Sequence, residues 1–119
     1  MNQTERIELL IALHALRDAS EWYQKESETR SQMVTGLFAK WRNAELADLA
    51  DTAHRNGDAL IADYRAITDQ IPAQWYTVPM CEHLIEIVEM GYPTSVSDLV
   101  RNYRVHFRNL QAELRACAA

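Results

Sequence analysis

Hydrophobic residues recur at helical spacing along most of this chain. Between residues 9 and 41 they belong to a ladder whose steps alternate between four and three residues, apolar at both ends and polar in the middle. The members of this ladder are Leu9, Leu13, Leu16, Ser20, Tyr23, Ser27, Arg30, Val34, Leu37 and Trp41. Such steps are typical of helices that pack along a coiled-coil seam. A second stripe runs from Leu46 to Ile71, and no segment shows the period of two that marks a strand, so the pattern predicts an all-α chain.

Prolines place the ends of the predicted helices. All three lie at positions 72, 79 and 93, and the first 71 residues contain none. Because proline inside a helix removes a hydrogen bond and clashes with the preceding turn, Pro72 is predicted to end a long, coiled-coil-like helical hairpin over residues 2–71. Pro79 suits the first turn of a new helix, which leaves residues 72–78 as a linker.

The first helix either breaks in its polar middle or makes the molecule elongated. Residues 24–32 include no apolar side chain, and Thr29 with Gln32 matches a capping box that would start a new helix. An unbroken helix from residue 3 to residue 41 would be about 55–60 Å long. A compact domain of this size has a radius of gyration of only about 13–14 Å. A break near Glu28 and an elongated rod both stay open, with continuity slightly favoured.

The second helix is predicted to begin after Asn43, a good N-cap residue, and to run to Ile71. Gly57 lies on its apolar stripe. A glycine there costs about 1 kcal/mol relative to alanine in a helix. Its missing side chain allows a neighbouring helix to approach closely.

A shorter helical hairpin is predicted at residues 79–116. Gly91 suits the position just beyond a helix end, and Pro93 prevents the helix from continuing. Ser95 is the predicted N-cap of the last helix. This helix–Gly–x–Pro–helix arrangement, which covers about a third of the chain from residue 80 to residue 114, resembles a hairpin that recurs in small uncharacterised bacterial helical proteins. The resemblance brings no function with it.

The start of the first helix is apolar nearly all round. Between Leu9 and Leu16, large side chains cover most of the helix circumference. A helix of this kind is normally buried on several sides, and a two-helix hairpin alone does not supply enough of them. We therefore expect an oligomeric bundle, a homodimer being favoured. The predicted interface residues are Leu9, Leu13, Leu16, Tyr23, Val34 and Leu37.

Composition indicates one small domain spanning residues 1–119, with no membrane span. The net charge of −5 argues against broad, nonspecific nucleic-acid binding. The most apolar run, residues 9–16, is far shorter than the roughly 20 residues of a transmembrane helix. Cys81 and Cys117 do not make a disulfide framework and are expected to be free thiols in a reducing cytoplasm. No cofactor is expected.

Two adjacent aromatic residues, Trp75 and Tyr76, are the best candidates for a specific partner contact, since aromatic anchors dominate many interfaces. The alternative is that both side chains fold back and plug the end of the helical bundle. The other two tryptophans, Trp22 and Trp41, are expected to pack in the helical core.

The last helix carries a basic face, which adds three candidate contacts with a partner. Its arginines lie about 140–200° from Leu99 around the helix and therefore point outward. They are Arg101, Arg104, Arg108 and Arg115, of which the first three are the contact candidates. A DNA-binding regulator that reads DNA with this helix is one alternative. Glu86 and Pro93 fit poorly into a helix-turn-helix motif, so a solvated face or one that meets an acidic neighbour is preferred.

Two sets of carboxylates stand at helical spacing, and they raise a second alternative. The sets are Glu45, Asp48, Asp51 and Glu82, Glu86, Glu89. All-helical nucleotide pyrophosphohydrolases hold magnesium between facing carboxylate helices, and the chain is similar to that family in this respect, without its dense paired acids on the first helix. Carboxylates on the back of amphipathic helices normally face water. We therefore assign no catalytic or metal-binding residue and expect a non-enzymatic protein–protein interaction or scaffold module.

Overall fold

The computed structural model describes residues 1–91 and 93–118, with the exception of the side chains of residues 110 and 118. Its helices are α1 (Gln3–Ser31), α2 (Ala39–Ile61), α3 (Arg65–Thr68), α4 (Val78–Glu89) and α5 (Val96–Ala118). Two 3-10 turns, η1 (Ala62–Tyr64) and η2 (Ala73–Trp75), lie in the connection between α2 and α4. These ranges contain no strand, so the prediction of an all-α chain is confirmed.

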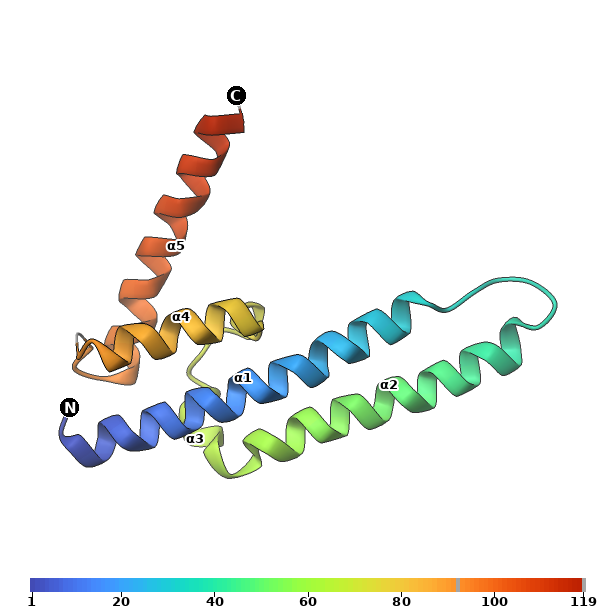
Figure 1. Cartoon of the computed structure of the whole chain (residues 1–119), viewed down its shortest axis with the longest axis horizontal. Coiled ribbons are helices and arrows are strands. Elements are labelled where there is room, and N and C mark those ends of the chain that lie inside the picture. The colour runs from blue at the N-terminus through green and yellow to red at the C-terminus, as the bar shows by residue number, and fades with distance from the viewer. Residues whose placement is uncertain (92, 119) are drawn as a thin grey trace.

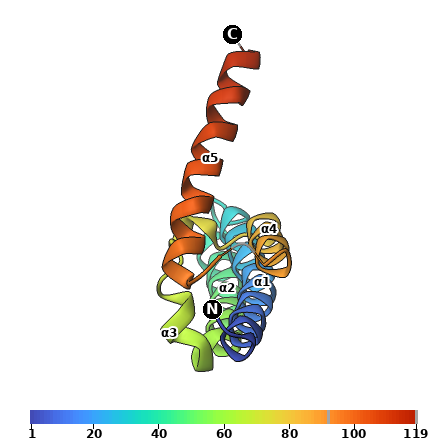
Figure 2. The ribbon, with the colours of Figure 1, turned by 90° about the vertical axis from the view of Figure 1, so that its left-hand side faces the viewer.

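The central helix of the molecule is α1. It lies beside α2, which runs in the opposite direction, while α4 packs along another side of α1 (Figure 1). The last helix, α5, leaves this body at a steep angle, and its C-terminal part projects beyond the other helices (Figure 2). The molecule measures 57 × 44 × 16 Å and has a radius of gyration of 17.6 Å. It is therefore more extended than a compact domain of this length.

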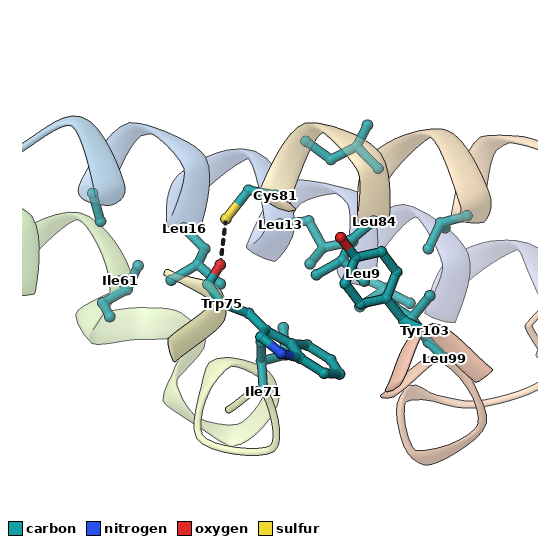
Figure 3. Close-up of a cluster of buried hydrophobic side chains, with 13 residues drawn as sticks. Leu9, Leu13, Leu16, Ile61, Ile71, Trp75, Cys81, Leu84, Leu99 and Tyr103 are labelled. Atoms are coloured by element: carbon teal, nitrogen blue, oxygen red, sulfur yellow. Dashed lines mark hydrogen bonds between the residues drawn. The ribbon is translucent and has the colours of Figure 1, made fainter. Parts of the chain in front are cut away.

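The core forms where α1, α4 and the connection from α2 to α4 meet. Leu9, Leu13 and Leu16 of α1 are at most 1% exposed. Figure 3 shows them among side chains of α4, the base of α5 and the connection. The expectation that one chain could not cover these leucines is wrong. It counted only the two helices of a hairpin, whereas α4 folds back onto α1. These three residues are therefore not available to a second copy.

A loop of residues 32–38 separates α1 from α2, so no single helix reaches Trp41. The break falls after Ser31 instead of near Glu28, and Thr29 does not start a helix. Its hydroxyl donates to the carbonyl of Lys25 inside α1, at 2.7 Å. The helix continues through its polar middle because those residues are compatible with helix, and it ends before Gly36, whose φ of 120° is unsuited to a helix.

Asn43 closes this loop and is not the N-cap of α2. It lies in the early part of that helix, and its carboxamide pairs with the backbone of Val34. The side chain accepts from the Val34 N–H and donates to the Val34 carbonyl, both at 2.9 Å. A side-chain amide carries both a donor and an acceptor, so it satisfies the two backbone groups that the loop leaves without a helical partner.

The second long helix ends at Ile61, well before the predicted end at Ile71. The chain then bends through η1 and the short α3. Ile61 and Ile71 are 0% and 3% exposed and belong to the same core cluster. A straight helix would carry these two residues about 15 Å apart. Burial of both therefore favours the bend, although no glycine or proline marks it.

Local signals mark both ends of α4 and the start of α5 as predicted. The side chain of Thr77 accepts from the Met80 N–H, and Pro79 lies in the first turn of α4. Gly91 has a φ of 81°, which ends that helix at little steric cost. The Ser95 hydroxyl accepts from the Asp98 N–H at 3.0 Å and caps α5.

Gly57 of α2 lies directly against the ring of Tyr23 of α1. A Cβ built at Gly57 would lie 2.6 Å from Cε1 of the Tyr23 ring, so only glycine fits under this ring. Tyr23 was predicted at an oligomer interface, but its ring is half-buried against α2 and takes part in packing within the chain.

We predict that Gly57→Ala destabilises the protein by about 1–3 kcal/mol, because overpacking outweighs the gain in helix propensity. Urea unfolding measures the change. In a Tyr23→Ala background the ring is gone, and the same substitution should stabilise by about 0.5–1 kcal/mol. Stabilisation in both backgrounds would show that the two helices do not meet at this point.

Candidate functional site

Large apolar side chains are exposed together where α1 turns into α2. Leu37 is 91% exposed, Trp41 75% and Phe38 71%. Val34 and Met33 are 48% and 39% exposed. We call these five residues the apolar tip. They lie at the end of the α1–α2 pair that is farthest from the N-terminus (Figure 1). Exposed apolar patches of this kind mark sites of interaction.

The apolar tip contains two of the six predicted interface residues, Val34 and Leu37. Trp41, which was expected in the core, also lies there. The helical ladder did not distinguish these positions from core positions because its spacing continues across the loop. Gly36 beside two large apolar residues was the signal for a turn with an exposed tip. Within residues 32–44 the only charged side chains are Lys40 and Arg42, and the first acidic residue after the tip is Glu45.

A polar network fastens α1 to α2 behind the tip. Tyr23 donates its hydroxyl to Oδ1 of Asp58 at 2.7 Å. His54 stands between two carboxylates: its Nδ1 lies 2.8 Å from Oε1 of Glu26, and its Nε2 lies 3.1 Å from Oδ2 of Asp58. These contacts join two residues of α1 to two residues of α2, and they fix the relative position of the helices that carry the apolar tip.

Arg30 extends the network towards the tip. Its guanidinium lies 2.9 Å from Oε2 of Glu26 in α1 and 2.8 Å from Oδ1 of Asp51 in α2. Arg30 was a polar member of the predicted ladder, and here it takes the place that an apolar residue would hold in a coiled-coil seam. Exposed ion pairs each contribute only about 0–1 kcal/mol, so the network orients the helices more than it stabilises them.

The network shifts the protonation of its members towards the paired forms. The hydrogen bond with Glu26 is the main reason that the pKa of His54 is raised, and Asp58 adds to it. Burial acts to raise the pKa of Glu26, but His54 and Arg30 together hold it below its usual value. Burial and then Asp58 raise the pKa of Tyr23, which keeps its phenol protonated as a donor.

A second candidate surface lies between α5 and residues 70–75. Two adjoining open grooves run here, the larger of about 610 Å³, and Arg104 and Arg108 line both of them. Arg101 lines the larger groove as well. We call this region the arginine groove. On the side facing α5 it is lined by Gln70, Gln74 and Trp75. The structure thus brings together four of the five predicted partner-contact residues.

The two aromatic residues of the linker, Trp75 and Tyr76, pack against different parts of the core. Trp75 is only 2% exposed and meets Tyr103 edge to face, with ring centroids 4.9 Å apart. Tyr76 is half-buried, stacks on Tyr23 and donates its hydroxyl to the carbonyl of Thr68 at 2.7 Å. The alternative that these side chains plug the bundle describes both residues. Tyr76 does not line the arginine groove.

Cys81 is the one cysteine of the core, and its surroundings suppress thiolate chemistry. Burial raises the pKa of its thiol. The thiol donates a hydrogen bond to the carbonyl of Trp75, with Sγ 3.7 Å from the oxygen (Figure 3), and Sγ lies 3.6 Å from the hydroxyl of Ser20. A buried, protonated thiol behaves as a small apolar side chain and not as a nucleophile.

The predicted carboxylate sets lie apart from one another. Glu45, Asp48 and Asp51 are exposed on α2, whereas the other set lies on α4. Asp51 pairs with Arg30, and Glu82 accepts from Arg17 at 3.0 Å. In the described part of the chain, no three histidine, cysteine or acidic side chains are grouped so that they could hold a metal ion. Nor do those residues include a helix with the length and apolar character needed to cross a bilayer.

Comparisons with protein-family models, with curated proteins and with solved structures found no match to this chain. Its function is therefore inferred from the arrangement of its own residues.

We predict that the contact between His54 and Glu26 stabilises the fold at acidic pH and fades at alkaline pH. The folded-state pKa of His54 is raised, so its contribution is complete below the unfolded value of about 6.5 and is lost as the pH rises through the folded value. A double-mutant cycle of His54→Gln and Glu26→Gln, followed by urea unfolding, should give a larger coupling free energy at pH 5.5 than at pH 8.5. An equal coupling at both values would contradict the assignment.

Proposed function

We propose that this protein is a non-enzymatic helical interaction module that associates with a second copy of itself through the apolar tip, a homodimer being favoured. The observation that supports this most strongly is the exposure of Leu37, Phe38 and Trp41, at 71–91%. Association would remove these side chains from water, which is favourable by about 25 cal/mol per Å² of apolar surface. Cys81 and Cys117 are both free, which suits a reducing compartment such as the cytoplasm.

The position of the tip favours contact with a second copy of the chain. It lies at one end of two long helices, where it can approach another molecule without a clash from α4 or α5 (Figure 1). The polar network behind it holds the helices in a fixed relation. A symmetric dimer uses the same patch on both subunits, so two apolar tips that face each other remove both patches from water.

DNA binding through the α5 arginines remains the second candidate function. The observation in its favour is that Arg101, Arg104 and Arg108 line one groove. The net charge of the chain, −5, opposes it. Titration with mixed-sequence duplex DNA at two salt concentrations distinguishes the candidates, because binding through phosphate contacts weakens steeply as salt rises. No binding at low salt would eliminate this second candidate.

We predict that the double variant Leu37→Ser/Phe38→Ser shifts the protein towards monomer. Both side chains point into solvent in a single chain, so their replacement leaves the core intact. Sedimentation velocity over a range of concentrations should show a dissociation constant at least about tenfold weaker, since each lost 1.4 kcal/mol of apolar burial is a factor of ten.

Met90→Ser/Leu114→Ser is the matched control. These two residues are 67% and 69% exposed but lie outside the apolar tip, Met90 at the C-cap of α4 and Leu114 in α5. It should associate like the unmodified protein. A monomeric unmodified protein at high micromolar concentration would contradict the proposed function. Equal weakening by both double variants would contradict the role of the apolar tip.

A further inference from the structure

We propose that the arginine groove binds an acidic, amphipathic helical segment of a partner protein. The proposal rests on the protein being an interaction module, but it does not depend on self-association through the apolar tip. It starts from the position of α5, whose base packs into the core through Leu99 and Tyr103. Beyond this base the helix projects from the body (Figure 2), so a ligand can reach the groove along α5.

The spacing of the three guanidinium groups suits a helix as the ligand. Arg101, Arg104 and Arg108 follow each other at intervals of three and four residues, so they lie along one flank of α5 over about 10 Å. Acidic residues at the same intervals on a second helix would form a matching row. Arginine pairs with carboxylates through two parallel hydrogen bonds, which adds geometric selectivity to the attraction.

The charges around the groove favour an anionic ligand. Among the described residues, no carboxylate lines either part of the groove. Arg101 already pairs with Asp98 at 2.8 Å. In the part of the chain that the structure describes, no carboxylate lies within 4 Å of the guanidinium group of Arg104 or of Arg108. Gln70 and Gln74 line the other side of the two grooves, and as neutral residues they do not repel a carboxylate. The Gln70 amide itself donates to the carbonyl of Ala66 at 2.7 Å.

The apolar residues of the groove favour an amphipathic ligand over a simple anion. Val100 and Val105 lie beside the arginines in the larger groove, and Phe107 lies beside them in the smaller one. Val105 is 54% exposed. A helix that carries aliphatic residues next to its acids would cover this surface while it pairs the guanidinium groups.

A protein ligand is favoured over a nucleic acid for two reasons. The whole chain carries a charge of −5, so a long polyanion would be repelled by most of its surface. A short acidic helix confined to the groove avoids that repulsion. The groove also offers the apolar contacts described above, which a phosphate backbone does not use.

The test is fluorescence anisotropy with a labelled, helical peptide of about fourteen residues that has glutamates at intervals of three and four and leucines beside them. The same peptide with glutamine at every glutamate position is the ligand control, and a mixed-sequence DNA duplex is the competing probe. We expect the glutamate peptide to bind at least about tenfold more tightly than either of the others, with an affinity that falls as salt rises.

Arg104→Gln/Arg108→Gln should weaken binding of the glutamate peptide by about tenfold or more, because it removes the two guanidinium groups shared by both grooves. Arg115→Gln, on the same helix but outside the grooves, should bind like the unmodified protein. Equal binding of the glutamine peptide, tighter binding of DNA, or unchanged binding by the double variant would each overturn the proposal. Repeating the titration with Leu37→Ser/Phe38→Ser separates it from self-association, since the peptide should bind that variant unchanged.

Discussion

The burial of α1 is the constraint on which the rest of this structure depends. Leu9, Leu13 and Leu16 share one face of α1, and the chain covers them with α4, the end of α2, the base of α5 and the bent connection. Burying a leucine contributes about 1.5–3 kcal/mol, so Leu9, Leu13 and Leu16 form a large part of the driving force for folding. The close approach at Gly57 and the bend after Ile61 both serve this packing.

The chain buries Leu9, Leu13 and Leu16 by itself, although Ile7 and Ile11 of α1 stay 46% and 47% exposed. The two candidate interaction surfaces lie elsewhere. The apolar tip and the arginine groove are carried by different parts of the molecule and differ in chemistry (Figure 1). One offers aromatic and aliphatic side chains at the end of two tied helices, and the other offers guanidinium groups along a projecting helix. A protein with two such surfaces could associate with its own kind at one and hold an acidic partner at the other, which is the arrangement expected of a scaffold.

Local chemistry made part of the fold predictable from sequence. Pro79, Gly91 and Ser95 marked helix ends because their effects act on the backbone of their own segment. The bend after Ile61 carried no such mark, since it follows from long-range burial. The apolar tip could not be predicted because the heptad spacing continues through the loop of residues 32–38, where it no longer marks core positions. The arginines were recognised from their shared helix face, but the groove also needs Gln70 and Trp75, which only the folded chain brings to α5.

Hydrogen–deuterium exchange of α1 at different protein concentrations tests most directly whether one chain buries its own central helix. The exchange rates would be compared at a low micromolar concentration, at which sedimentation shows monomers, and at a concentration about a hundredfold higher. If a single chain covers Leu9, Leu13 and Leu16, the amides around Leu13 and Leu16 will be equally protected in both samples. Loss of their protection on dilution would contradict the account, because it would show that a second copy is needed to bury them.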